Sequence, residues 1–267
     1  MTAAPTAPAP APPPEQKNRP LGAFFLVVLA LSIPFWVAEP FARALFGELP
    51  IQLPLSALMA FLPAIVALVF VWRGEGRAAA GRLFARAVDV GRMKTLWWII
   101  PAALGFPAIL FLSWLTMIAL GLPLPALQAP PPTMIPIFVV FFLGAVGEEL
   151  GWSGYVLDPM QDRWGALRAA VLLGLFWTGW HVIPFIQTGR SAEWVVWHAA
   201  GLVPTRVLMV WLYNAAGRSV FASVLFHAMS NVAFFLFPTL GSHYDPRVTT
   251  PILVVAAVGV VWARRVH

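Results

Sequence analysis

Eight long, mainly apolar stretches run through this chain of 267 residues, and they constrain its fold more than any other feature. An α-helix needs about 20 apolar residues to cross the hydrocarbon of a bilayer. We therefore predict an all-α fold, a polytopic membrane helix bundle with about eight transmembrane helices. The predicted spans are residues 21–38, 53–72, 96–120, 133–157, 167–186, 194–213, 218–238 and 250–263.

The composition excludes several classes of protein. Sixty per cent of the residues are hydrophobic and only 10% are charged, whereas soluble domains are about 25% charged. The chain has no cysteine, which excludes a disulfide scaffold, a cysteine-ligated metal site and a cysteine nucleophile. The net charge of +6 does not indicate a nucleic-acid partner, because the basic residues lie between the apolar stretches.

Charge placement predicts how the chain is oriented in a membrane. Residues 1–20 are predicted to be a disordered, Ala/Pro-rich cytoplasmic tail, and residues 21–267 the integral membrane domain. With the N-terminus inside, thirteen Lys and Arg residues lie on the cytoplasmic side or at the nearest span ends, against only Arg43, Arg190 and Arg247 outside. This bias predicts that both termini are cytoplasmic. We expect the membrane to be the inner membrane of a bacterial cell.

A basic segment follows the second span. Residues 77–94 carry Arg82, Arg86, Arg92 and Lys94 beside the apolar residues Leu83, Phe84, Val88 and Met93. This pattern predicts an amphipathic interfacial helix on the cytoplasmic face, and the alternative is a solvated loop. No internal repeat is visible, which weakens a transporter interpretation.

Ionisable residues inside predicted spans are the informative ones, because burying such a group costs about 2.5–3.5 kcal/mol on insertion scales. Six are present, together with the polar Asn231: Glu148, Glu149, His181, His198, Arg206 and His227. Glu148 and Glu149 are adjacent and so point about 100° apart on a helix. One of them can face a cavity while the other braces a neighbouring helix.

Spacing suggests which of these groups act together. His227 and Asn231 are four residues apart and share a helix face, and the same spacing lets Trp177 pack under the imidazole of His181. Glu148, His181 and His227 all lie well inside their spans and can meet at similar depth. Burying each of these three side chains in a membrane costs free energy, and the presence of all three in one chain favours a functional site.

The remaining histidines carry less information. His198 has only Trp194 and Trp197 near it in the sequence, and we interpret it as a packing residue. His243 lies in a predicted loop and His267 at the terminus, and neither is assigned a role.

Three motifs resemble those of the CPBP intramembrane proteases, also called the ABI family, which are relatives of the CAAX prenyl protease Rce1. The family pattern is Glu-Glu-x-x-x-Arg, then Phe-x-x-x-His, then His-x-x-x-Asn or Asp two helices later. This chain has Gly147-Glu-Glu-Leu-Gly-Trp-Ser-Gly-Tyr155, Trp177-Thr-Gly-Trp-His181 and His227-Ala-Met-Ser-Asn231. The motifs occur in this order on separate spans, and the resemblance covers about residues 77–236.

The chain departs from the family pattern twice. Trp177 replaces the Phe, which exchanges one aromatic packing group for another. Ser153 replaces the Arg, and a serine supplies no charge to the buried carboxylate of Glu149. We hypothesise that Arg206, the only arginine deep inside a span, compensates, because it also needs a buried partner.

The resemblance implies an intramembrane endopeptidase that hydrolyses a peptide bond of a membrane-associated protein or peptide. Glu148 would take a proton from a water that His181 helps to orient, and His227 and Asn231 would donate hydrogen bonds to the oxyanion. Glu149, Arg206 and Trp177 would support them. Besides this substrate, the lipid bilayer is the only expected partner, and no oligomeric state is predicted. A prenylated substrate is not carried over, because bacteria largely lack such proteins.

Several alternatives stay open. Glu148, His181 and His227 also form a donor set that suits catalytic zinc. We favour a metal-free site with no cofactor, because Asn231 is a poor zinc ligand and no His-Glu-x-x-His motif is present. Ser153 favours a catalytically inactive membrane scaffold of the same fold. A proton-coupled transporter and a purely structural bundle are the remaining alternatives.

Overall fold

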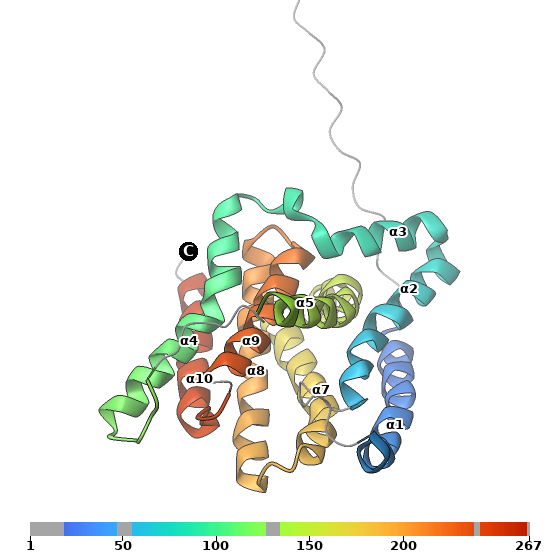
Figure 1. The fold of residues 1–267 in the computed structure, drawn as a ribbon. Coiled ribbons are helices and arrows are strands. Elements are labelled where there is room, and N and C mark those ends of the chain that lie inside the picture. Colours follow the sequence, from blue (N-terminus) through green and yellow to red (C-terminus); the bar gives the residue numbers. More distant parts are fainter. Residues whose placement is uncertain (1–18, 47–54, 127–133, 238–240, 266–267) are drawn as a thin grey trace, which may run out of the picture.

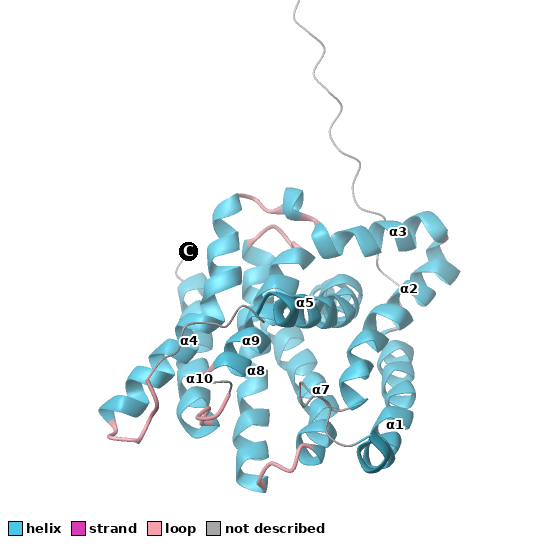
Figure 2. Cartoon of the chain, viewed as in Figure 1, coloured by secondary structure: helices cyan, strands magenta, loops and turns pink. Residues whose placement is uncertain are grey.

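The computed structural model describes residues 19–46, 55–126, 134–237 and 241–265, and the only regular structure in these ranges is helical (Figures 1 and 2). The predicted all-α class is confirmed. Seven helices of the described ranges are long and apolar enough to cross a membrane, and an eighth apolar helix, Val220–Leu236, is shorter. Each lies at one of the eight predicted spans. The chain is therefore a polytopic, integral membrane helix bundle.

The helices follow one another with short connections. They are α1 Leu21–Phe46, α2 Leu62–Glu75, α3 Arg77–Ala85, α4 Ile99–Ala119, α5 Met134–Gly151, α6 Leu157–Trp164, α7 Ala166–Gln187, α8 Ala192–Ala215, α9 Val220–Leu236 and α10 Pro246–Arg265. A 3₁₀ helix, Leu55–Phe61, precedes α2, and the 3₁₀ turns Arg86–Val88, Val90–Arg92 and Leu96–Trp98 connect α3 to α4. A π-helical turn, Trp152–Val156, joins α5 to α6.

Helix continues seven or more residues past the predicted end of two spans. The first span was predicted to end at residue 38, but α1 continues to Phe46, because Glu39 is buried and its carboxylate accepts from the Ser56 N–H at 3.3 Å. The fourth span was predicted to end at residue 157, but helix continues to Trp164. Of the predicted disordered tail, residues 1–18 lie outside the described residues.

The helices pack around α9 and α8. In Figure 1, α5 is seen nearly end-on, while α7, α8 and α10 run along the plane of the view, so α5 crosses them steeply. Helix α9 packs against both α4 and α5, and α8 packs between α7 and α10. This crossing brings the C-terminal end of α5, which carries two glutamates, against α9 and within reach of side chains from α7 and α8.

The amphipathic helix predicted over residues 77–94 is present only in its first half, as α3, which lies across one end of the bundle in Figure 1. Beyond Ala85 the chain forms the 3₁₀ turns Arg86–Val88 and Val90–Arg92, where the carboxylate of Asp89 accepts from the Ser219 hydroxyl and the Phe221 N–H. The inner face of α3 buries Ala79 and Leu83, while Arg82 and Phe84 are exposed. This distribution is amphipathic, as the sequence predicted. Its location at a cytoplasmic membrane surface stays a prediction.

Two glycines of α5 allow its backbone to touch α2 and the 3₁₀ helix that precedes α2. A Cβ atom at Gly147 would lie 2.6 Å from the carbonyl oxygen of Ala60, and one at Gly151 would lie 2.5 Å from Cβ of Pro63. Membrane helices pack closely where small residues repeat at this four-residue spacing. The two glycines flank Glu148 and Glu149 on α5, so this close packing fixes the part of the helix that carries both glutamates.

We expect Gly151→Ala to destabilise the protein by at least about 1–3 kcal/mol, the usual cost of overpacking, because the obstructing atoms belong to the backbone and ring of a proline. The matched control is Gly144→Ala on the same helix, where a Cβ atom would meet nothing within 4 Å. Thermal unfolding of the purified variants in detergent measures the difference. Equal unfolding temperatures for the two variants would contradict this account of the packing.

Candidate active site

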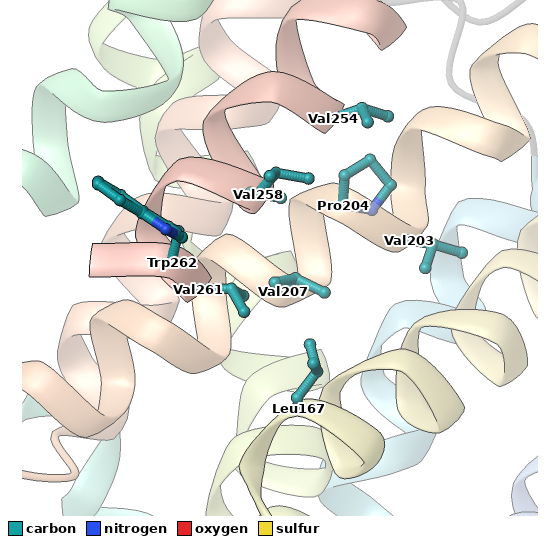
Figure 3. Close-up of a pocket in the computed structure, with 9 residues that line it drawn as sticks. Leu167, Val203, Pro204, Val207, Val254, Val258, Val261 and Trp262 are labelled. Carbon is teal, nitrogen blue, oxygen red and sulfur yellow. The ribbon is translucent and has the colours of Figure 1, made fainter. Parts of the chain in front are cut away.

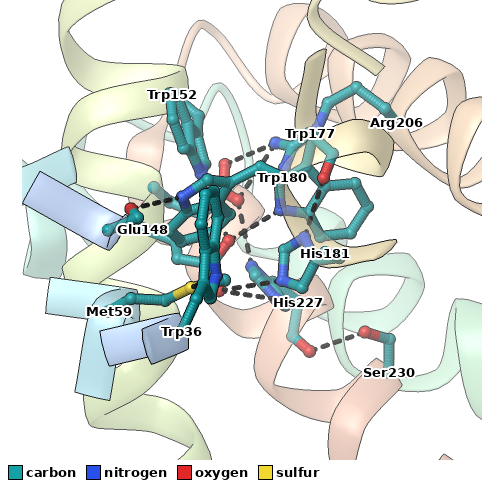
Figure 4. Close-up of polar contacts among 12 residues, drawn as sticks. Trp36, Met59, Glu148, Trp152, Trp177, Trp180, His181, Arg206, His227 and Ser230 are labelled. Carbon is teal, nitrogen blue, oxygen red and sulfur yellow. Dashed lines mark hydrogen bonds and ion pairs between the residues drawn. The ribbon is translucent and has the colours of Figure 1, made fainter. Parts of the chain in front are cut away.

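Glu148, near the C-terminal end of α5, is buried, with only 5% of its surface exposed. Its Oε2 atom accepts hydrogen bonds from the indole N–H groups of Trp177 at 2.7 Å and Trp152 at 3.2 Å. Its Oε1 atom faces two imidazoles, with His181 Nε2 at 3.8 Å and His227 Nε2 at 3.9 Å. Figure 4 shows the three side chains, which come from α5, α7 and α9, turned toward one another. The predicted meeting of these groups is present in the structure.

The orientation of both imidazoles is fixed through Nδ1. Nδ1 of His181 lies 2.8 Å from the carbonyl oxygen of Trp177, and Nδ1 of His227 lies 3.0 Å from Glu149 Oε1. A carbonyl or carboxylate oxygen only accepts, so each Nδ1 carries a proton and donates it. In the neutral form of each ring, Nε2 is then an acceptor directed at the space beside Glu148 Oε1.

Glu149 is fully buried and forms the second half of the site. Both of its carboxylate oxygens accept from Nη1 of Arg206, at 3.0 and 2.9 Å, and its Oε2 atom also accepts from the hydroxyl of Ser153. Arg206 is 0% exposed, and its guanidinium lies 4.2 Å from the ring centroid of Trp177. Arg206 thus supplies, from α8, the positive charge that Ser153, in the π-turn after α5, does not supply.

The two adjacent carboxylates therefore face different groups, as their spacing predicted. Glu148 faces the imidazole of His181, while Glu149 pairs with Arg206 on a neighbouring helix. His227 touches both, through Nε2 and Nδ1 respectively. A buried charge is stable only when it is paired and hydrogen-bonded, and Arg206 meets this need for Glu149. The charged Glu149 in turn accepts from Nδ1 of His227 and holds that ring in place.

Tryptophans form the walls of this cluster. The Trp177 ring packs edge-on against His181 and His227, with centroids 5.1 and 5.4 Å apart. Trp177 packs against His181 as predicted, but the sequence did not predict that its indole N–H donates a hydrogen bond to Glu148. Trp152 was also missed, although it lies four residues after Glu148 on the same face. Trp180, a further wall residue, donates to Ser32 of α1 at 2.7 Å.

The other predicted polar residues have different environments. Asn231 is half-buried, one turn beyond His227, and its amide makes no hydrogen bond with any of the described residues. His198 lies outside the cluster, where Nδ1 is 3.1 Å from the hydroxyl of Tyr244 and the ring stacks on Trp194. His243 forms a hydrogen bond with Ser242, and His267 lies outside the described residues.

The donor types suit zinc, but their spacing does not. Tetrahedral zinc holds nitrogen and oxygen ligands at about 2.0–2.2 Å, which places neighbouring ligand atoms about 3.3 Å apart. The distances from Glu148 Oε1 to the two Nε2 atoms, 3.8 and 3.9 Å, are wider. In the part of the chain that the structure describes, no three His, Asp or Glu side chains are arranged to hold a metal ion. A water about 2.8 Å from Oε1 and from either Nε2 does fit this spacing.

A separate groove lies between α7, α8 and α10 (Figure 3). It has a volume of about 370 Å³, and every residue that lines it is apolar: Leu167, Val203, Pro204, Val207, Val254, Ala257, Val258, Val261 and Trp262. No titratable or hydrogen-bonding side chain apart from the indole of Trp262 lines it. The groove therefore offers apolar contact but no reacting group.

Comparison with known proteins gives two matches. The sequence model of the family described as "Type II CAAX prenyl endopeptidase Rce1-like" matches residues 130–233, which include Glu148, His181 and Asn231. The chain is also 22% identical over 225 residues to CAAX prenyl protease 2 of Methanococcus maripaludis, covering 78% of this chain and 82% of that protein. The region matched by the family model contains all three motifs and the whole polar cluster.

Proposed function

We propose that this chain, which is similar to the Rce1-like endopeptidase family over residues 130–233, is an intramembrane endopeptidase that hydrolyses a peptide bond with a water activated by Glu148. The observation that carries this proposal is the convergence of Glu148 Oε1 with the Nε2 atoms of His181 and His227, at 3.8 and 3.9 Å. Oε2 is held by two indole N–H groups, so Oε1 is the oxygen left to accept a proton.

In this mechanism Glu148 takes one proton of the water while His181 Nε2 accepts a hydrogen bond from the other. The water oxygen bonds to the peptide carbonyl carbon, and the carbonyl oxygen becomes an oxyanion. The amide of Asn231, which is free of other described partners, donates to that oxyanion. The C–N bond then breaks as Glu148 returns its proton to the leaving amine.

His227 plays a more restricted role than the sequence predicted. With Nδ1–H donated to Glu149, a neutral His227 has no proton on Nε2 and cannot donate to the oxyanion. It donates only as an imidazolium, whose charge the adjacent carboxylates of Glu148 and Glu149 would stabilise. We therefore propose that Asn231 donates to the oxyanion in every protonation state of the site, whereas His227 donates only when its imidazole is protonated.

The inactive-scaffold alternative depended on Ser153. Since Arg206 pairs with Glu149 at 2.9 Å, the missing family arginine no longer argues against catalysis. We propose a membrane-associated protein or peptide as the substrate, cleaved within the inner membrane of a bacterial cell, with both termini of the enzyme cytoplasmic.

The test uses purified protein in liposomes, mixed with membrane vesicles from cells that lack it, in water enriched in ¹⁸O. Hydrolysis by water places ¹⁸O in each new C-terminal carboxyl, which mass spectrometry detects. We expect new labelled C-termini with the native protein, and at least about 100-fold less of them with Glu148→Gln. Identical peptide patterns in the two samples would contradict proteolysis and favour the scaffold.

Chelation tests the proposed absence of a cofactor. We expect 1,10-phenanthroline or EDTA to leave the rate of ¹⁸O-labelled product unchanged, because no step of the mechanism uses a metal. Elemental analysis should find less than one zinc per chain. A loss of activity that zinc restores would overturn this and make Glu148, His181 and His227 the ligands.

A further inference from the structure

The helix that carries both glutamates changes its register directly after them. In the π-helical turn Trp152–Val156, the N–H of Leu157 donates to the carbonyl of Trp152, five residues back. Single π-turns inside helices occur frequently at functional sites. Here the turn separates α5, which carries Glu148 and Glu149, from α6.

Pro159 removes one backbone donor from this turn. Its nitrogen has no hydrogen, and residue 159 would donate to Tyr155 O in an α-helix and to Gly154 O in a π-helix. Buried carbonyls without a donor are costly, particularly in a membrane. Donors from elsewhere in the chain can pair with these carbonyls.

Two arginines from distant segments supply these donors. Nη1 of Arg19, just before α1, donates to Tyr155 O at 2.9 Å, and Nη1 of Arg86, at the end of α3, donates to Gly154 O at 3.1 Å. The side chains of Arg19 and Arg86 are only 11% and 13% exposed. Neither is part of the catalytic cluster.

Each arginine is itself fixed by further contacts. Arg19 forms an ion pair with Glu75 at 3.2 Å, and its guanidinium lies 4.5 Å from the ring centroid of Tyr155. Arg86 donates from Nη2 to the hydroxyl of Tyr213 at 2.8 Å and to the carbonyl of Arg218 at 3.0 Å. The two guanidinium groups therefore anchor the π-turn to α2, α8 and the start of α9.

The turn that they anchor also holds both carboxylates. Trp152 and Ser153, its first two residues, donate to Glu148 and Glu149 respectively. The two arginines are thus connected to Glu148 and Glu149 through hydrogen bonds and one turn of backbone. A shift of the turn displaces both carboxylates together.

We propose that Arg19 and Arg86 are positioning residues, which set the register of Glu148 and Glu149 by holding the carbonyls of Tyr155 and Gly154. This inference rests on the proposed function, because it concerns the geometry of the same site. A misplacement of about 1 Å can cost 10²-fold in rate.

The test compares Arg86→Met, Arg86→Lys and Arg19→Met with the control Arg82→Met. Arg82 is exposed on α3, four residues before Arg86. The measured rate is the rate at which the most abundant ¹⁸O-labelled product forms. It is determined at increasing concentrations of vesicle protein and divided by the amount of folded enzyme. Hydrogen exchange of residues 152–158 in the same samples reports the turn itself.

We expect Arg86→Met and Arg19→Met to lower the maximal rate about 10- to 100-fold, with an unchanged half-saturating vesicle concentration and faster exchange in the turn. Arg86→Lys, which keeps a donor, should recover part of the rate, and Arg82→Met should match the native protein. If Arg86→Met does not fold, Arg86→Lys and Arg19→Met decide. A native rate per folded molecule in these variants would overturn the inference, whereas no labelled product from the native protein would instead overturn the proposed function.

Discussion

Glu148→Gln is expected to lower the rate of hydrolysis by about 10²–10⁴-fold, the usual contribution of general acid–base catalysis. The amide oxygen of glutamine can still accept from the indole N–H groups of Trp152 and Trp177, so the cluster should keep its shape. What is lost is the oxygen that takes the proton of the water. The initial rate of ¹⁸O-labelled product and the unfolding temperature, measured on the same preparation, separate these two effects.

The matched control is His198→Asn. His198 is also a half-buried membrane histidine, but its partners are Tyr244 and Trp194, outside the catalytic cluster. Its substitution should leave the rate at the native level. Equal losses in Glu148→Gln and His198→Asn would mean that activity responds to any polar change in the bundle, and Glu148 would then not be the base.

Arg206→Met is expected to destabilise the protein by about 3–5 kcal/mol, because it leaves the charge of Glu149 buried without a partner. Arg206 and Glu149 are both 0% exposed, so water cannot replace the lost contact. Ser153→Ala, which removes only one hydrogen bond to the same carboxylate, should cost about 1 kcal/mol. Yield in detergent and unfolding temperature measure both effects.

The double variant Glu149→Gln with Arg206→Met separates folding from catalysis. Removing both charges should recover much of the stability lost in Arg206→Met, because no unpaired charge remains. Activity should stay low, since the neutral amide that replaces the Glu149 carboxylate cannot stabilise a protonated His227. Full activity in the double variant would show that the ion pair is not needed by the site.

Much of the fold and of the site follows from burial cost. Long apolar stretches predict the membrane helices, because only such stretches cross the hydrocarbon. The same cost marks Glu148, His181, His227 and Arg206 as residues that need partners, and the missing arginine at position 153 predicts a pair between Arg206 and Glu149. In each case the sequence places an ionisable side chain inside an apolar span, and such a side chain needs a hydrogen-bond or ion-pair partner close to it in the fold.

The features that the sequence did not predict depend on contacts between distant segments. Arg19 and Arg86 lie 136 and 68 residues from the carbonyls that they hold, and nothing local in the chain indicates this pairing. The sequence likewise did not predict that the backbone of α5 approaches the 3₁₀ helix Leu55–Phe61 at Gly147 and α2 at Gly151. Pro159 was the available signal for an irregular helix, since it removes a donor inside an apolar run.

The most direct test of proteolysis at Glu148 is a comparison of protein N-termini in the membrane fraction of living cells. Cells that carry the native protein are compared with cells that carry Glu148→Gln at equal expression, with His198→Asn as the control. The proposed function predicts at least one new N-terminus that is present with the native protein and His198→Asn and absent with Glu148→Gln. Identical sets of N-termini in all three strains, across several growth conditions, would contradict it.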